Sequence, residues 1–269
     1  MSGFDSTWLA LREPADRAAR APAMVARLSS HLATVNTPRV LDIGCGTGST
    51  WRSLANALPD SVCWTLLDHD STLLDEAKKR IGERENVQFY QHDLTDIDRL
   101  PLKDVAIVTA SALFDLCSET FCAALSARLA VQSCGLYAAL NYNGVMTWTL
   151  PLPLDAQVLA NFNQHQRTDK GFGAALGPDA TDCLHHHLVA HGFELSCASS
   201  PWRMDAGMKD LQIAFLTGLR LPLVEIGNLS PAQIDQWISE RISLIDAPDS
   251  LCEVGHTDLI ALPAIALQA

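Results

Sequence analysis

The stretch from Arg39 to Thr50 constrains the fold of this chain more than any other part of it. The apolar run 40–43 carries an acid, passes into three alternating glycines, and opens into a segment, residues 50–58, that is compatible with a helix. An apolar run of this kind predicts a strand buried on both faces, as in a parallel sheet covered by helices. Glycines permit a sharp turn and the close approach of a ligand. A helix that starts after them presents free N–H groups to that ligand, so a binding site is expected at this turn.

The charge of the chain excludes several partners. The 269 residues carry a net charge of −12, and 48% of them are hydrophobic. This composition is typical of a globular enzyme, and the acidic balance argues against a basic face for duplex nucleic acid or for an anionic membrane. Neither a basic-then-apolar leader nor an apolar run near the length of a membrane span is visible, so we expect a cytoplasmic protein with no membrane partner.

Cysteine and histidine spacing raises the question of a metal site. The 8 cysteines are scattered without a C-x-x-C pair, which favours buried, reduced thiols. Cys183, His187 and His191 recur every four residues on one face of a predicted helix. They are either three metal ligands or the seam of an ordinary helix. Because no clear fourth ligand accompanies them, we expect no bound metal.

Two more acids close the next two predicted strands. Residues 61–70 predict a strand that ends in Asp68, and residues 86–94 predict one that ends in Asp93. A carboxylate at the end of the second strand of an α/β nucleotide site can accept hydrogen bonds from both ribose hydroxyls. The alternative for Asp68 is to cap the next helix, but Asp70 is the better cap candidate. With Asp42, three successive strands end near an acid, a pattern that core packing does not require.

This pattern of glycines and acids resembles motif I of the class I S-adenosylmethionine (SAM)-dependent methyltransferases. The resemblance covers roughly residues 38–142 and rests on the G-x-G-x-G spacing together with the acids that end the strands. It implies a Rossmann-like, seven-stranded, mostly parallel α/β sheet with helices on both faces, an antiparallel last strand and helical and loop cap insertions. It also implies SAM as cofactor and S-adenosylhomocysteine (SAH) as product. A dinucleotide fingerprint is spaced G-x-G-x-x-G instead.

The resemblance implies roles for residues around the cofactor. The glycine loop lies under the methionine and ribose, Asp68 binds the ribose, and Asp93 with the backbone of Leu94 binds adenine. His69 either stacks on adenine or is merely an exposed loop residue. An arginine of the N-terminal helix either pairs with the carboxylate of SAM or is solvated. The implied cofactor-binding residues are Asp42, Gly44, Cys45, Gly46, Gly48, Asp68, His69, Asp93, Leu94, Thr109, Ala110 and Arg20.

The acceptor side is less constrained. Residues 109–115 lack the Asn/Asp-Pro-Pro-aromatic motif that nucleobase-amine methyltransferases carry, so a small-molecule acceptor is favoured over nucleic acid. The polar, glycine-containing segment 143–177 is either a substrate lid or a solvated surface loop. His165 is a candidate general base, because an unperturbed histidine titrates near neutrality, and Tyr142 and Asn143 are candidates for orienting the acceptor. The expected substrate-binding residues are Phe114, Asn163, Arg167, Asp169 and Lys170.

We expect one domain over residues 1–269. Its parts are an N-terminal helical cap (1–37, with new helices at Pro14 and Pro22), a SAM-binding core (38–142), the lid (143–177), and a C-terminal part (178–269) with helices over 205–226 and 231–245 inserted before the last strand. The expected function is transfer of a methyl group to oxygen or nitrogen of a small molecule, by a monomer or homodimer. The alternatives are a non-catalytic SAM-binding protein, a nicotinamide-dependent oxidoreductase, and SAM chemistry other than methyl transfer.

Overall fold

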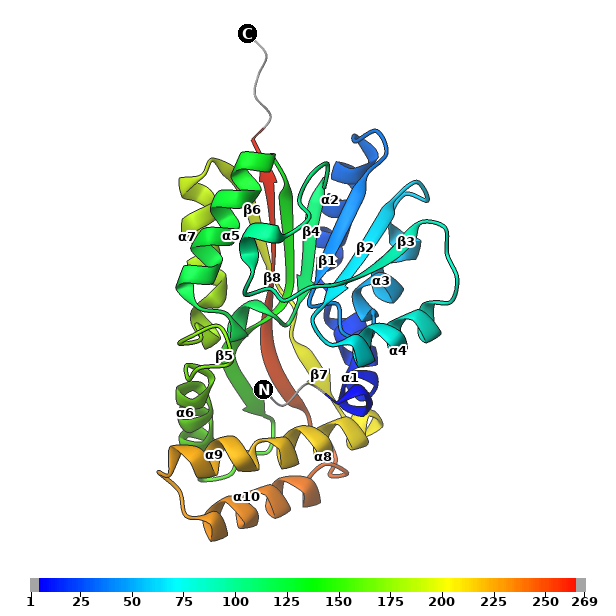
Figure 1. Cartoon of the computed structure of the whole chain (residues 1–269). Helices are drawn as coiled ribbons and strands as arrows, with labels where there is room; N and C mark the ends of the chain where they lie inside the picture. Colours follow the sequence, from blue (N-terminus) through cyan, green and yellow to red (C-terminus); the bar gives the residue numbers. More distant parts are fainter. Residues whose placement is uncertain (1–4, 265–269) are drawn as a thin grey trace.

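A mixed sheet of eight strands forms the centre of the molecule (Figure 1). The computed structural model describes residues 5–264. Strands follow the order β3-β2-β1-β4-β5-β8-β6, and the short β7 pairs with β8. The first five strands are parallel, whereas β8 is antiparallel to β5, β6 and β7, which confirms the predicted antiparallel last strand and adds one short strand to the predicted seven. The strands are β1 (Arg39–Ile43), β2 (Cys63–Asp68), β3 (Val87–Gln91), β4 (Ile107–Ser111), β5 (Gly135–Trp148), β6 (Phe193–Ser199), β7 (Trp202–Met204) and β8 (Cys252–Pro263).

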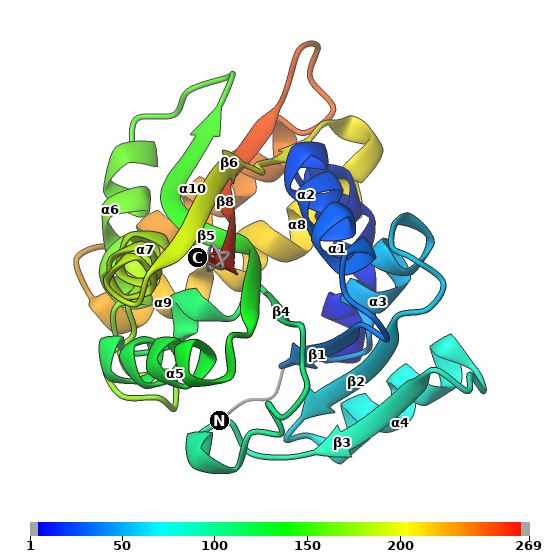
Figure 2. The ribbon, with the colours of Figure 1, turned by 90° about the horizontal axis from the view of Figure 1, so that it is seen from above.

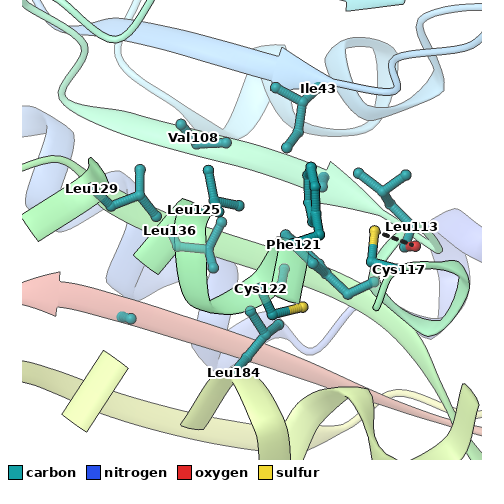
Figure 3. Packing of buried hydrophobic residues seen from close by; sticks show 14 of the residues in the cluster. Ile43, Val108, Leu113, Cys117, Phe121, Cys122, Leu125, Leu129, Leu136 and Leu184 are labelled. Atoms are coloured by element: carbon teal, nitrogen blue, oxygen red, sulfur yellow. Dashed lines mark hydrogen bonds between the residues drawn. The ribbon is translucent and has the colours of Figure 1, made fainter. Parts of the chain in front are cut away.

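Helices cover both faces of this sheet, as predicted (Figure 2). Successive strand residues point to opposite faces. Accordingly, Leu41 and Ile43 pack in the cluster that faces α5 and α7, whereas Val40 packs in the cluster that faces α2, α3 and α4. Figure 3 shows the first cluster, in which Leu125 of α5 and Leu184 of α7 approach the sheet. The helices are α2 (Pro22–Ala33), α3 (Ser49–Leu54), α4 (Ser71–Ile81), α5 (Glu119–Gln132) and α7 (Ala180–Ala190).

A helical cap lies beyond the carboxyl ends of the parallel strands, where β5 and β8 extend past the rest of the sheet (Figure 1). The cap has its own apolar core, which includes Val158, Leu223 and Trp237. Asp155 ties two of its helices together, because it accepts from Trp237 Nε1 at 2.9 Å and pairs with the buried Arg241. The cap helices are α6 (Asp155–Gln166), α8 (Lys209–Gly218), α9 (Arg220–Ile226) and α10 (Pro231–Ser243).

The predicted lid is only partly a loop. Residues 143–148 continue β5, because β8 pairs with them, and residues 155–166 form α6, because Val158 and Phe162 give that segment an apolar face toward the cap. The polar side chains of the segment had concealed both elements in the sequence. Residues 149–154 and 167–176 are the loops that remain of this segment, and the second of them is the longer.

A bulge in β5 is held by one buried carboxylate. Leu140 has φ 56°, a left-handed conformation that is an outlier for a bulky residue, and the β5–β8 register shifts there. Asp258 of β8, fully buried, accepts from Leu140 N at 2.8 Å, from Tyr137 Oη at 3.0 Å and from Ala21 N at 3.0 Å. A bulge bends the strand and redirects the side chains that follow it. Asp258 therefore fixes the course of β5 toward the cap and also anchors the start of α2.

The N-terminal helix α1 (Ser6–Ala19) runs through Pro14, so the prediction that Pro14 begins a new helix was wrong. Tertiary contacts override the local signal: the Trp8 ring packs edge-on against Trp202 of β7 at 6.3 Å, and Asp16 accepts from Trp202 Nε1 at 2.9 Å. Pro22 does occupy the first position of α2, as predicted. Among the helices described, none is long and apolar enough to cross a membrane.

Candidate active site

A cavity of about 900 Å³, here called the main cavity, lies at the carboxyl ends of β1, β2 and β4. This is the edge of an open α/β sheet where ligands bind. Its volume is within the range of small-molecule sites. The lining comes from four places: the glycine turn, the ends of the strands, α1 and the loop 167–176 of the predicted lid. The lining of the main cavity includes Trp8, Leu9, Arg12, Gly44, Cys45, Gly46, Thr50, Asp68, His69, Asp93, Leu94, Ser111, Ala112, Asp169, Lys170 and Phe172.

The glycine turn has the backbone that its sequence predicts. Gly44, Gly46 and Gly48 have φ values of 61°, 53° and 81°, which side chains other than glycine rarely adopt. A Cβ at Gly48 would also lie only 2.8 Å from Ile81 Cδ1, so the Ile81 side chain of α4 would have to shift to make room for it. Gly44 and Gly46 line the main cavity, whereas Gly48 caps α3 behind it.

Asp68 connects the end of β2 to the glycine turn. Its side chain is 7% exposed, one oxygen accepts from Gly46 N at 2.8 Å, and the other accepts from Asp70 N at 3.0 Å. A carboxylate offers about four lone-pair positions, so capacity remains for two hydroxyl donors in the cavity. Asp70 caps α4 through Thr72 N at 2.8 Å, as predicted. The half-exposed His69 also lines the cavity, with Nδ1 3.3 Å from Asp68.

Asp93 lies two residues past the end of β3 and lines the same cavity together with Leu94. It accepts from Thr95 N at 2.9 Å, and hydrogen bonds from Thr95 lower the pKa of the carboxyl. The group is therefore a charged acceptor at neutral pH. The structure thus brings Asp68 and Asp93, from neighbouring strands, to one cavity.

Asp42 lies behind the cavity wall and is fully buried. It accepts from Thr109 Oγ1 at 2.7 Å, and burial raises its pKa to about 7. Within the described residues, its second oxygen has no hydrogen-bond partner. Within residues 5–264, Thr109 and Ala110 are also buried and do not line the main cavity.

Arg20 is also buried behind this wall. Its Nη2 donates to Ser111 Oγ at 2.7 Å, and Ser111 Oγ is 3.1 Å from Thr50 Oγ1. Over the described part of the chain, Nε and Nη1 of Arg20 are buried and have no partner. Ser111 and Thr50 do line the cavity, so they separate Arg20 from it. Unsatisfied donors beside an unsatisfied acid fit a site completed by a polar ligand or by water.

A second cavity of about 310 Å³, here called the aromatic cavity, adjoins the main cavity. Trp8, Arg12, Ala112 and Leu116 line both. Ala112 and Leu116 follow the carboxyl end of β4. The remaining lining of the aromatic cavity is largely apolar and aromatic: Asp115, Leu140, Tyr142, Phe162, Gln166, Trp202, Ala214, Phe215, Gly218, Leu219, Val254 and His256.

Two buried titratable groups face the aromatic cavity. Asp115 is 8% exposed and burial raises its pKa to about 6, so it is mostly ionised at neutral pH. His256 is 5% exposed and burial lowers its pKa to about 3, so its ring is neutral. Considering residues 5–264 alone, neither Asp115 Oδ1 nor His256 Nδ1 has a hydrogen-bond partner.

Tyr142 lies in the wall of the aromatic cavity, close to where the sequence placed it. Its hydroxyl donates to Asn163 Oδ1 at 2.8 Å, and Asn163 Nδ2 donates to the Gly144 carbonyl at 2.9 Å. Burial raises the pKa of Tyr142, so the phenol stays protonated. Asn163 therefore orients Tyr142 from behind.

The loop 167–176 reaches the main cavity through Asp169, Lys170 and Phe172. Asp169 shapes the loop by accepting from Gly171 N at 2.7 Å and Gly173 N at 3.1 Å. Phe172 packs against Phe121 of α5, with ring centroids 5.1 Å apart. Asp169 and Lys170, expected to bind substrate, thus lie at the cofactor side.

Several predicted residues lie elsewhere. His165 Nε2 is 2.8 Å from Glu225 Oε2 of α9, because α6 turns this side chain toward the cap. Arg167 pairs with Asp179 at 2.8 Å, Phe114 is fully buried in the core, and Asn143 accepts from Val145 N within β5. Across residues 5–264, neither cavity lining includes any of these four. The structure therefore does not bring His165 to the place where a base would act.

Asp115, Trp202, Phe215 and His256 were missed in the sequence. Asp115 left a signal, since it is a single acid in the apolar run 112–116 that follows the fourth strand. The other three come from β7, α8 and β8, and only the long-range pairing of β8 brings them to the cavity. In the part of the chain that the structure describes, no group of three His, Cys, Asp or Glu side chains is arranged to hold a metal ion.

Comparisons with known proteins agree with this geometry. Residues 40–131 match the family model described as a methyltransferase domain. The cyclopropane synthase MmaA2 from Mycobacterium tuberculosis is similar in structure, with 16% identity, coverage of 96% of this chain and 94% of that chain, and a TM-score of 0.53. A cyclopropane-fatty-acyl-phospholipid synthase-like protein from Lactobacillus casei is also similar, with 16% identity, 91% coverage of each chain and a TM-score of 0.54. At this identity the likeness shows the fold.

No curated protein sequence matches the chain. The family match covers the glycine turn and the acids that end β1, β2 and β3. Methyltransferases of this family use SAM, which agrees with the cofactor that the motif predicts and with a cavity lined by the hydrogen-bond-accepting carboxylates of Asp68 and Asp93. Residues 40–131 thus match a methyltransferase domain, and the whole chain has the Rossmann-like fold seen in class I SAM-dependent methyltransferases.

Proposed function

We propose that this protein transfers the methyl group of SAM to a small molecule that binds in the aromatic cavity. The observation that carries the proposal is the junction of the two cavities at Ala112 and Leu116, directly beyond β4. A ligand in each cavity would meet there. Methyl transfer from a sulfonium is an in-line displacement, so alignment of the two ligands supplies much of the catalysis.

In this proposal the main cavity binds SAM. Asp68 accepts hydrogen bonds from the ribose hydroxyls, Asp93 and the Leu94 backbone bind adenine, and His69 stacks on the ring. The Gly44–Gly46 backbone would lie under the sulfur end of SAM. Ser111 and Thr50 would bind the amino acid end of SAM, in front of Arg20 and Asp42. When bound, SAM supplies an electrophilic methyl group. The residues of the loop 169–172 and of α1 exclude water from it, which limits hydrolysis and strengthens the electrostatic interactions.

On the acceptor side, Tyr142 and the aromatic walls orient the small molecule. Asp115 is the only carboxylate among the described lining residues of the aromatic cavity, and we assign to it the proton-accepting role that the sequence suggested for His165. Its pKa of about 6 places a base near neutrality, which suits proton transfer.

Isothermal titration with SAM, SAH and NAD tests the cofactor assignment. We expect SAM and SAH to bind and NAD not to bind; preferential binding of NAD would favour the oxidoreductase alternative. A screen for transfer of radiolabelled methyl from SAM to small-molecule extracts, with nucleic acid and protein as comparison substrates, then tests turnover. Binding of SAH without transfer to any acceptor would support a non-catalytic role instead.

A further inference from the structure

The charges around the aromatic cavity leave one carboxylate uncompensated. Arg12 is already paired, because its Nε and Nη2 lie 2.9 and 3.1 Å from the two oxygens of Asp16. The guanidinium also lies over the Trp202 ring, 5.1 Å from its centroid. Arg12 offsets a small part of the rise that burial gives the pKa of Asp115, but its positive charge is shared with Asp16. With His256 neutral, the described lining groups and Asp16 together carry one excess negative charge. A buried ion without a partner is costly, so a ligand that supplies a positive charge is favoured there.

The walls of the aromatic cavity favour the same kind of ligand. Tyr142 lies edge-on to Phe162 with centroids 5.6 Å apart, and Trp202 lies 5.1 Å from His256 and 6.4 Å from Phe215. Aromatic faces attract cations, and the attraction grows where water is excluded. An anionic acceptor would instead meet both the carboxylate and the electron-rich ring faces. A neutral acceptor with a hydroxyl group could donate a hydrogen bond to the buried carboxylate oxygen, but it would leave the negative charge uncompensated.

We infer that the acceptor is a basic amine with an apolar body, whose nitrogen binds between the aromatic rings and the Asp115 carboxylate. This inference rests on the proposed methyl transfer. The bound ammonium passes one proton to Asp115, and the neutral nitrogen then forms a bond to the methyl carbon. The carbon–sulfur bond breaks with its electron pair going to sulfur. The nitrogen takes the positive charge that the sulfonium loses, so the step balances.

The test compares three probes of similar size and different charge: phenethylamine, 2-phenylethanol and 3-phenylpropionate. Each is titrated by calorimetry into protein saturated with SAH. We expect the amine to bind about tenfold or more tightly than the alcohol, and the carboxylate to bind most weakly. Equal affinities for amine and alcohol, tighter binding of the anion, or binding of no probe would overturn the inference.

Variants then assign the effect to one side chain. Asp115→Asn keeps the shape of the residue and is expected to lower phenethylamine affinity about tenfold while changing 2-phenylethanol affinity less than about twofold. The control is Asp210→Asn, an exposed acid on α8, the helix that also carries Phe215; it should change neither affinity. An equal loss for both probes in Asp115→Asn would assign the effect to packing and sink the amine assignment.

SAH affinity distinguishes a failure of the proposed methyl transfer from a failure of the amine assignment alone. If the unaltered protein binds no SAH, the proposed methyl transfer fails. If it binds SAH but does not prefer the amine, the amine assignment alone fails. Asp115→Asn should retain SAH affinity, because Asp115 lines only the aromatic cavity among the two described here.

Discussion

Asp68 joins the glycine turn to the end of β2 by accepting hydrogen bonds from two backbone N–H groups. Asp68→Ala removes both bonds and the ribose acceptor, so we expect SAM affinity to fall by about tenfold to a hundredfold. Isothermal titration measures this change. Asp75→Ala, which removes an exposed acid of α4, is the matched control and should bind SAM normally. Unchanged affinity in Asp68→Ala would exclude the ribose role.

Asp42 makes folding stability depend on pH. Burial raises its folded pKa to about 7 from the ordinary value of 3.8, so the folded state holds a proton that the unfolded state releases. Stability from this residue therefore falls as pH rises from about 4 to about 7, and the loss is complete above that range. Burial outweighs the neighbouring groups: Thr109, Arg20 and Thr50 lower the pKa of Asp42, and the negative charge of Asp68 raises it.

Asp42→Asn should remove that dependence. Measured by urea unfolding of SAM-free protein, the variant should be more stable than the wild type at pH 8 by about 2–4 kcal/mol, and about equal to it near pH 4. The amide oxygen can still accept from Thr109. A variant that is less stable than the wild type at pH 8 would show that the carboxylate is held charged at no cost.

Among the elements, the bulged strand β5 depends on Asp258. Asp258→Ala would leave the N–H groups of Leu140 and Ala21 buried without their acceptor, and we expect a loss of about 3–5 kcal/mol in the free energy of unfolding. Tyr137→Phe removes one donor to the same carboxylate and should cost about 1 kcal/mol. Urea unfolding of both variants measures the difference; similar losses would argue against a carboxylate-held bulge.

The elements that the sequence predicts well are the locally encoded ones. The turn after β1 can be recognised in the sequence because each of its glycines has a positive φ. The acids at the ends of β2 and β3 can be recognised because they follow predicted strands. The extension of β5 and the helix α6 were missed because their stability comes from β8 and from α9, more than fifty residues away in the chain. His165 was proposed as a base from its residue type and its position in the segment 143–177, and only the direction of α6 shows that it meets Glu225.

For the whole molecule, α1 and the loop 167–176 approach the main cavity from segments far apart in the chain. Binding of SAH should therefore link α1 to the loop 167–176, which the sheet alone does not hold together. We expect SAH at about 100 times its Kd to add about 2.7 kcal/mol, which raises Tm by several degrees. Hydrogen exchange should slow in residues 6–12 and 169–172. Protection confined to the glycine turn would show that neither segment closes on the cofactor.

The contact between Trp8 and Trp202 gives the protein a built-in optical reporter. Both indoles lie in the wall of the aromatic cavity, while Trp64 and Trp237 are enclosed in separate cores. A molecule that enters the cavity displaces water beside the two rings and alters their emission. The other four tryptophans, Trp51, Trp64, Trp148 and Trp237, line neither of the two cavities and contribute the background. Occupancy of the site can thus be followed by intrinsic fluorescence, without a label and before any turnover is detected.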